Sequence, residues 1–447
     1  MEKIRSMLWN DNVKALVSES WAVSWPMTLI MLFEFFIGIT DIYVAGKFGK
    51  EAQAAYGIAF QLYFVFIIIG IALSVGLVSV VSRLFTSGRR EEFTAAVNSS
   101  LLLAIMSGLL FSAAGVLFAR QVIGMLNMPE GVKYYAAPFL LIYSIGFVFD
   151  YALMAANGIL RASNSIKASF LIMAIVCVMN VALDFALSFG TPLGFKGIAV
   201  ATVISLATGS FLALIRVRKL IGKVFKLSAA VIKNILNISW PSGLQQVLWQ
   251  ISAIILYTIL GMLPAHNVEI LAAFTNGLKI ESAIFLPAFA FHMANEVVVG
   301  NLLGKKDNAN AFRGGIITAV VGVSIVFVIT ILIMLNARQI AATLSDNGIV
   351  VGESVRYIYI ALLCEPVMAW GVVLGGGLNG AGDTRGVMTI FALAVWLVRL
   401  PLSYLLGIYY GMGAVAIWWA MNLSILIQTV FITKRYFARK WFDLAAG

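Results

Sequence analysis

Charged residues are scarce in this chain of 447 residues: 11% are Asp, Glu, Lys or Arg, whereas 61% are hydrophobic. An average soluble domain has about 25% charged residues, so this composition excludes an ordinary water-soluble protein. Only nine prolines and no long polar segment interrupt the chain. Each helix that crosses a bilayer needs about 20 apolar residues, and period-two alternation typical of an outer-membrane barrel is not visible. We therefore expect an all-α membrane protein.

Cysteine and histidine are nearly absent, with two of each. Cys177 and Cys364 lie in apolar runs, so we expect small buried side chains and no disulfide framework. His266 and His292 lie in different settings and form no metal-ligand cluster. The chain also lacks a Gly-x-x-x-x-Gly-Lys-Ser/Thr phosphate loop, so ATP does not drive it directly. The sequence predicts neither a resident cofactor nor an enzyme.

Long apolar runs separated by short polar joints predict twelve membrane-spanning helices. The polar N-terminus has no small-residue cleavage site, so the first span should remain as an uncleaved anchor. The predicted spans are 16–45, 54–82, 94–119, 134–160, 168–189, 195–215, 236–263, 270–303, 311–335, 354–380, 386–408 and 412–433.

The basic residues behind the formal charge of +11 are unevenly distributed between the predicted loops. Most Lys and Arg residues lie at the two termini and in the even-numbered loops, and the basic segment 216–233 is one of these loops. The positive-inside rule then predicts a protein of the inner (plasma) membrane with both termini on the cytoplasmic side. The charge reports topology and contact with anionic lipid. No basic patch with interleaved aromatics accompanies it, so we expect no nucleic-acid partner.

The chain repeats itself at an offset of roughly 216 residues. Six helices per repeat is an even number, so both halves have the same orientation. Parallel six-helix repeats are typical of transporters whose substrate site lies between the halves. The matching segments are Trp25-Pro26 with Trp240-Pro241, 88–91 with 304–307, 161–167 with 379–385, and 197–199 with 413–415.

This repeat predicts two pseudo-symmetric six-helix lobes. The expected divisions are a cytoplasmic segment 1–15, an N-lobe 16–219, a basic linker 220–235, a C-lobe 236–438 and a cytoplasmic tail 439–447. Gly380-Ala381-Gly382-Asp383 matches a motif of intramembrane aspartyl proteases. Its Asp lies in a cytoplasmic joint and its repeat partner is Ser165, so we do not expect protease activity.

Ionisable residues inside spans are expensive, and they mark functional sites. Four oxygen-bearing side chains of the first half fall at a similar depth near the outer surface: Asp41, Asn180, Asp184 and Thr202. The repeat partners of Asp41, Asp184 and Thr202 are apolar: Leu256, Leu400 or Pro401, and Trp418, respectively. A structural requirement of the fold would recur in both halves, so we favour cation binding over a structural hydrogen-bond network, which remains the alternative.

Three helix faces of the first half mix methionine with polar groups, and they predict a cavity for varied amphipathic ligands. The candidate cavity residues are Met27, Met31, Glu34, Asn157, Met173 and Cys177. Ordinary core packing is the alternative for the methionines. Pro26 lies inside the first helix, removes one backbone hydrogen bond and is a candidate hinge; a static kink is its alternative.

The Trp-Pro pair of the first span, Asp41 followed by Gly46 and Gly49, and the repeated joints 161–167 and 379–385 resemble the multidrug and toxic compound extrusion (MATE) family over nearly the whole chain. The acidic pattern is most similar to the DinF-type branch. It departs from the NorM-type pattern, which has a glutamate in the seventh helix; here that helix has Gln245, Gln246 and Gln250.

The resemblance implies that Asp41, Asn180, Asp184 and Thr202 converge to bind a coupling cation, H⁺ or Na⁺. It implies an antiporter that exports organic, cationic amphipathic compounds by alternating access. We expect a monomer in the bilayer with small organic molecules as substrates. A flippase for lipid-linked oligosaccharides is the alternative, although it favours a cationic cavity; a passive channel would not explain the asymmetric carboxylates.

The second half has buried charges of its own. Glu281, Glu296 and Glu365 lie in its apolar helices. Either Lys279 or Arg399 is expected to pair with Glu365, because pairing offsets the desolvation of a buried charge.

Overall fold

The computed structural model describes residues 11–221 and 225–446. These residues are almost entirely helical and contain no strand. Twelve helices within them are long and apolar enough to cross a membrane, which confirms the predicted all-α fold. Each predicted span falls on one of these helices. Most helix ends lie beyond the predicted ends because polar residues continue the helix past the apolar run, whereas residues 195, 262–263 and 412 were predicted in spans and lie just outside the helices.

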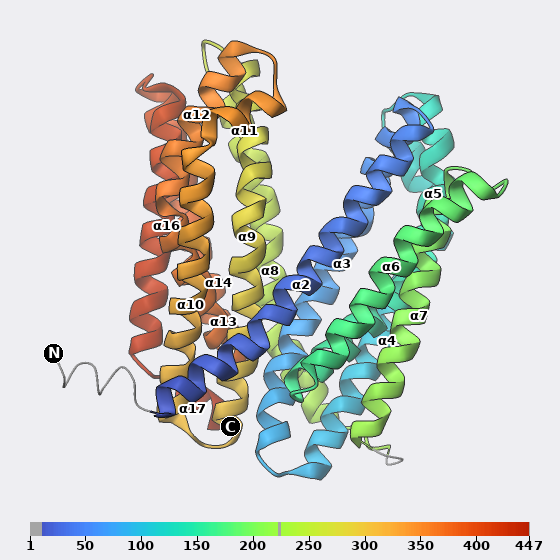
Figure 1. The fold of residues 1–447 in the computed structure, drawn as a ribbon, viewed down its shortest axis with the longest axis vertical. Coiled ribbons are helices and arrows are strands. Elements are labelled where there is room, and N and C mark those ends of the chain that lie inside the picture. The colour runs from blue at the N-terminus through green and yellow to red at the C-terminus, as the bar shows by residue number, and fades with distance from the viewer. Residues whose placement is uncertain (1–10, 222–224, 447) are drawn as a thin grey trace. The chain divides into compact units, whose positions relative to one another are not determined.

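The helices group into two compact units, which Figure 1 shows as two bundles of long helices. The first, here called the N-unit, comprises residues 29–221 and 225–243. Helix α5 is its centre, because it packs against α3, α4 and α7. The N-unit contains most of α2 (Asp11–Lys47), then α3 (Lys50–Thr86), α4 (Arg90–Met125), α5 (Glu130–Ala162), α6 (Ile166–Gly190), α7 (Lys196–Ile221) and the start of α8 (Ala229–Gly261).

The second unit, here called the C-unit, comprises residues 11–28 and 244–446. It contains two short helices that the apolar pattern did not predict, α11 (Ala337–Leu344) and α17 (Trp441–Ala446). Its tenth and eleventh spans include irregular turns. Its other elements are α9 (Asn267–Gly304), α10 (Asn308–Leu335), α12 (Gly348–Ala361), η1 (Leu362–Cys364), α13 (Glu365–Gly380), α14 (Thr384–Ala392), η2 (Leu393–Arg399), α15 (Leu400–Tyr404), η3 (Leu405–Tyr409) and α16 (Gly413–Phe437).

The first helix of each repeat belongs to both units. Helix α2 changes unit between Thr28 and Leu29, two residues after Pro26, and α8 changes unit between Gly243 and Leu244, two residues after Pro241. The start of α2 is bound to the C-unit, where the Thr318 hydroxyl of α10 donates a hydrogen bond of 2.8 Å to the Ser20 hydroxyl. In both helices, the change from one unit to the other therefore comes directly after the repeated Trp-Pro pair.

The turns between helices repeat in their backbone conformation. Each of four connections in the first half has a residue with a positive φ angle, and so does its partner in the second half. The offset between these paired turn residues is 217 or 218 residues. Gly88 is therefore equivalent to Lys306, whereas the sequence comparison had aligned it with Gly304. The pairs are Gly49 with His266, Gly88 with Lys306, Asn164 with Gly382, and Gly194 with Gly411.

The centre of the C-unit is a close helix pair. Two glycines of α13, Gly376 and Gly380, face the backbone carbonyls of His292 and Glu296 on α9 so closely that a Cβ atom would overlap them. The four-residue spacing on both helices is the small-residue pattern that lets membrane helices approach. The glycines therefore position α9 against α13, and this fixes the place of the polar side chains that these helices carry.

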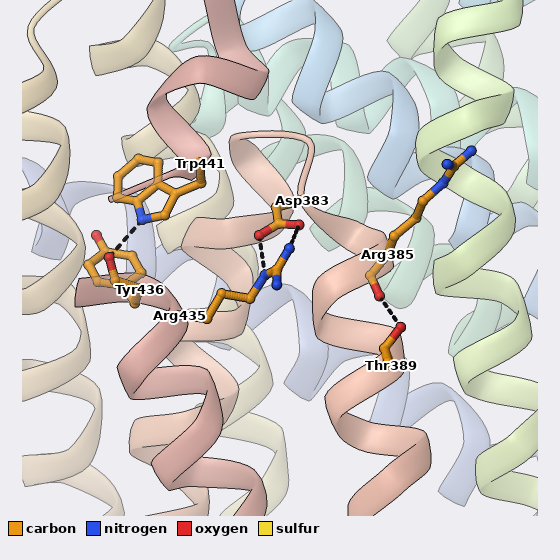
Figure 2. Close-up of polar contacts among 6 residues, drawn as sticks. All are labelled: Asp383, Arg385, Thr389, Arg435, Tyr436 and Trp441. Carbon is orange, nitrogen blue, oxygen red and sulfur yellow. Dashed lines mark hydrogen bonds and ion pairs between the residues drawn. The ribbon is translucent and has the colours of Figure 1, made fainter. Parts of the chain in front are cut away.

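One end of the C-unit is held by polar contacts, which Figure 2 shows. Asp383, in the turn between α13 and α14, is buried and accepts two hydrogen bonds from the guanidinium of Arg435 on α16, at 2.5 and 2.8 Å. Trp441 of α17 is also buried and donates a 2.8 Å hydrogen bond to the carbonyl of Tyr436. Asp383 thus has a structural ion pair that ties two helices together.

Candidate functional site

Three helices of the N-unit carry the four predicted site residues. Asp41 lies near the end of α2, Asn180 and Asp184 lie one turn apart on α6, and Thr202 lies in the first half of α7. The four-residue spacing puts the amide and the carboxyl of α6 on one helix face. All four side chains are buried, with exposed fractions of 1%, 1%, 0% and 7% in that order.

Direct contacts connect these side chains in two pairs. The Asn180 amide donates a hydrogen bond of 3.3 Å to the Thr202 hydroxyl, which itself donates to the Ile198 carbonyl at 3.1 Å. The carboxyl groups of Asp41 and Asp184 interact electrostatically with each other. The structure therefore brings α2, α6 and α7 together at this point.

The site is rich in acceptors and poor in donors. One oxygen of Asp41, the amide oxygen of Asn180 and both oxygens of Asp184 are buried and accept no hydrogen bond from the described residues. Leaving a buried acceptor without a partner costs about 1–3 kcal/mol, and two carboxylates close together repel each other. A proton or a small hard cation would satisfy these oxygens, because carboxylate, amide and hydroxyl oxygens suit such cations.

Two tyrosines complete the surroundings of the site, and neither was predicted. The Tyr56 hydroxyl of α3 donates a hydrogen bond of 3.2 Å to a carboxylate oxygen of Asp41. Tyr143 of α5 interacts with Thr202 and lies within electrostatic range of both carboxylates. Aromatic residues in an apolar helix give no sequence signal of their own, so only the helix packing reveals them.

The C-unit provides an internal control for this convergence. The partners that the sequence comparison gave to three site residues, Leu256, Leu400 and Trp418, lie together in one buried hydrophobic cluster. Trp418 stacks on Phe274 and meets Tyr357 edge to face, with ring centroids 5.5 and 4.7 Å apart. The residues that the sequence comparison aligned with the site thus form an aromatic core in the C-unit, whereas the N-unit carries a group of buried oxygens.

The predicted cavity residues differ in exposure. Met31 is half-buried and Glu34 is exposed, whereas Met27 is fully buried and belongs to the C-unit. The other three predicted cavity residues are buried in the N-unit. Asn157 accepts a hydrogen bond of 3.0 Å from Ser169, Cys177 contacts the carbonyl of Phe33, and Met173 is 6% exposed.

Glu34 is one member of a second polar group in the N-unit. It lies within electrostatic range of Asp150 on α5 and of Arg161 at the end of the same helix. Asp150 accepts a hydrogen bond of 2.9 Å from the Tyr63 hydroxyl. The Tyr63 ring packs against the Tyr143 ring, with centroids 4.4 Å apart. Asp150 lies on the same helix as the predicted cavity residue Asn157.

Pro26 lies in the interior of α2, which stays helical from Asp11 to Lys47. Hydroxyls on either side of it bond back to the helix: Ser24 donates to the Ser20 carbonyl at 2.7 Å, and Thr28 donates to the Ser24 carbonyl at 3.0 Å. The helix therefore continues through its proline without a break. The boundary between the two units lies two residues further along the helix, after Thr28.

Comparison with known proteins places both repeats in one family. Residues 26–186 and 241–405 match the sequence model of the MatE family. The chain is 24% identical over 439 residues to the "Probable multidrug resistance protein NorM" of Bradyrhizobium diazoefficiens, covering 94% of this chain and 92% of that protein. It is 22% identical to the protein of the same name from Thermotoga maritima, covering 98% and 96%. The bent form of the Vibrio cholerae MATE transporter VcmN has a similar fold, with a TM-score of 0.88, 19% identity and coverage of 96% and 99%.

Proposed function

The chain belongs to the MATE family of membrane transporters, and on this premise we propose that it is an antiporter that exports organic, cationic amphipathic compounds in exchange for H⁺ or Na⁺. The observation that carries the proposal is the buried group of unpartnered oxygens on Asp41, Asn180 and Asp184. Several relatives carry names of multidrug resistance proteins, which supports export of more than one compound.

The coupling cation binds between α2, α6 and α7. Asp41 and Asp184 supply the negative charge, and Asn180 and Thr202 supply neutral oxygens. When the cation leaves, two carboxylates remain close together in a buried site, and this state is disfavoured by repulsion and by desolvation. Cation release on one side and rebinding on the other therefore drive a conformational cycle.

The substrate is attracted to the acidic face of the N-unit. Exposed Glu34 and half-buried Asp150 are acidic, and Met31, three residues before Glu34 on α2, offers a flexible apolar surface. Their combined attraction favours compounds that carry a positive charge on an apolar body. One elementary charge that moves down a potential of 100 mV supplies about 2.3 kcal/mol, so each net positive charge that enters per cycle supports a substrate gradient of about fiftyfold.

Pro26 is the proposed hinge of this cycle. Occupancy of Asp41 changes how α2 bends, because the missing backbone hydrogen bond at a proline lowers the resistance of a helix to bending. The change of unit two residues further on supports this role. Coupled transport that is unaltered in Pro26→Ala would contradict it.

The proposed setting is the inner (plasma) membrane, with both termini in the cytoplasm and the chain acting as a monomer. The distribution of Lys and Arg between the loops supports this orientation. A cysteine introduced beyond Trp441 and probed with an impermeant thiol reagent in whole cells and in inverted vesicles tests it.

Transport in proteoliposomes tests the function. Ethidium uptake into vesicles with entrapped DNA is followed under an imposed pH gradient and, separately, an imposed Na⁺ gradient. We expect uptake under one of them, and its loss in Asp41→Asn and Asp184→Asn. The matched control is Glu296→Gln, a buried carboxyl of the C-unit. Absence of uptake under both gradients would refute an antiporter for organic cations and favour a flippase.

A further inference from the structure

The polar face of α6 continues beyond the proposed coupling site. Ser188 lies one turn after Asp184 and two turns after Asn180, so the three side chains share one face of the helix. Ser188 is 4% exposed, and its hydroxyl has no hydrogen-bond partner among the described residues. Other buried hydroxyls of the N-unit bond to the carbonyl one turn earlier, as Thr202 and Ser144 do at 3.1 and 2.7 Å. Ser188 therefore extends the row of unpartnered buried oxygens by one turn.

Helix α7 packs along this row of oxygens. Near the start of α7, Gly197 lies so close to Ser188 that a Cβ atom would overlap the Ser188 hydroxyl and backbone nitrogen. Further along, the Asn180 amide bonds the Thr202 hydroxyl at 3.3 Å. The seam between the two helices therefore runs from Ser188 past Asp184 to the coupling site. The step from Ser188 to Asp184 is about 6 Å along the helix axis.

An aromatic cluster lies at the Ser188 end of this seam. Phe48, in the turn between α2 and α3, stacks on Phe189 of α6 with centroids 5.6 Å apart and planes inclined by 7°. It also meets Phe195, in the turn before α7, edge to face at 6.5 Å. Figure 1 shows the end of α2 and the turn between α6 and α7 at the same end of the N-unit. Because Phe189 directly follows Ser188 in the chain, the cluster lies next to the unpartnered hydroxyl.

The same cluster is connected to the coupling site. Phe195 packs against Phe139 of α5 with centroids 4.9 Å apart, and Phe139 meets the Tyr56 ring edge to face at 5.8 Å. The Tyr56 hydroxyl is the donor to the Asp41 carboxylate. Phe195 and Phe139 are buried, whereas Phe48 is half-buried. The cluster therefore has a buried side that reaches the site and an accessible side at the end of the unit.

We propose that the coupling cation enters and leaves its site along the seam between α6 and α7, with Ser188 as an intermediate oxygen ligand and Phe48 as the plug of this route. A hydroxyl oxygen can ligate Na⁺ or accept a hydrogen bond from a hydrated proton. Packing alone accounts for the phenylalanines, but it does not account for a buried hydroxyl without a partner. This inference rests on the proposed function, because it gives the proposed cation its route.

The chemical labelling of a cysteine at position 188 tests the plug. Purified full-length protein in detergent is treated with 2-(trimethylammonium)ethyl methanethiosulfonate, a small cation, and the adduct is followed by mass spectrometry. We expect Phe48→Ala to raise the rate at which Ser188→Cys is labelled by about tenfold, which corresponds to 1.4 kcal/mol in opening the plug. The chain without Ser188→Cys, which retains Cys177 and Cys364, gives the background.

The charge of the reagent distinguishes a cation route from a general opening. The 2-sulfonatoethyl reagent carries a negative charge, and the rates of both reagents are corrected by their rates with free cysteine. In the Phe48→Ala background the cationic reagent should label Ser188→Cys faster, because the Asp184 carboxyl lies one turn away. Asp184→Asn should reduce this preference. Equal corrected rates for the two reagents in the Phe48→Ala background would overturn the cation route.

The matched control for the plug is Tyr134→Ala. Tyr134 is an aromatic residue near the start of α5, is 76% exposed and meets Tyr135 at 5.3 Å, so its removal should leave the labelling of Ser188→Cys unchanged. If Phe48→Ala does not fold, Phe189→Ala removes the other ring of the stack and provides the same test. A labelling rate that neither variant raises would overturn the plug and leave the cluster a packing feature.

Transport kinetics test Ser188 itself. In the gradient-driven ethidium assay, Ser188→Ala should raise the cation concentration for half-maximal transport several-fold and change the rate at saturating cation less, because entry is slowed while the four residues of the site remain. An unchanged half-maximal concentration would remove Ser188 from the route.

The labelling needs no transport, so the two proposals fail separately. If neither gradient drives ethidium uptake but Phe48→Ala opens position 188 to the cationic reagent, the antiporter fails and the route stands. If a cation gradient drives uptake but labelling is the same in all variants, the antiporter stands and the route fails.

Discussion

Replacing Tyr56 by Phe should make the proposed coupling cation bind more tightly. The Tyr56 hydroxyl donates to the Asp41 carboxylate at 3.2 Å and so stabilises the site when it is empty and ionised. Phenylalanine removes this donor and retains the ring, which packs against Phe60 and Phe139 with centroids 6.0 and 5.8 Å away. The empty state is then destabilised relative to the occupied state.

The size of this effect follows from the length of the bond. A hydrogen bond to a charged group contributes about 1.5–3 kcal/mol, and 3.2 Å is long for such a bond, so we expect the lower end. At 1.4 kcal/mol per factor of ten, the cation concentration for half-maximal transport should fall about tenfold. Turnover should fall as well, because release of the cation becomes harder.

The assay is ethidium transport in proteoliposomes as a function of internal and external cation concentration. Tyr63→Phe is the matched control, because it removes the tyrosine donor of Asp150 at 2.9 Å and leaves Asp41 its partner. We expect its half-maximal cation concentration to match that of the wild type. Weaker cation binding in Tyr56→Phe would refute the reasoning and indicate that the hydroxyl oxygen is itself a ligand of the cation.

Three further outcomes are expected. Thr202→Val should weaken cation binding about tenfold, measured in the same transport assay, because a neutral oxygen of the site is lost; equal affinity would remove Thr202 from the site. Arg435→Met should destabilise the folded state by about 3 kcal/mol, measured by thermal unfolding, since Asp383 is then buried without its partner; a wild-type melting temperature would contradict this. Gly376→Ala should lower the yield of folded protein because its Cβ overlaps a backbone carbonyl, whereas Gly352→Ala, whose Cβ meets nothing within 4 Å, should not.

The number and order of the spans could be predicted because the bilayer imposes one length and one polarity on every helix. The interruptions could not. Residues 393–399 and 405–409 form π-turns within a largely apolar run that Arg399 interrupts, and composition does not distinguish one hydrogen-bond pattern from another. The helix α11 was missed because its eight residues are too few for an apolar run and five of them are exposed.

The candidate site could be predicted in part for a similar reason. Asp41 and Asp184 stand out because a carboxyl in an apolar helix is expensive, and depth along each helix follows from counting residues. Which helices face each other does not follow from counting. Tyr56 and Tyr143 therefore remained hidden, and the choice between Lys279 and Arg399 as partner of Glu365 stayed open until the side-chain directions were known.

The starts of α2 and α8 each belong to the unit formed mainly by the other half of the chain, so the two halves of the repeat cannot be separated into complete units. A cut between residues 221 and 225 yields one fragment that carries residues 11–28 of the C-unit and another that carries residues 229–243 of the N-unit. Neither fragment contains a complete unit, as in a domain-swapped dimer. The two fragments should be insoluble when expressed alone and recover transport when expressed together. Each half of the repeat supplies a helical segment to the unit formed mainly by the other half, so we expect both halves to be required together.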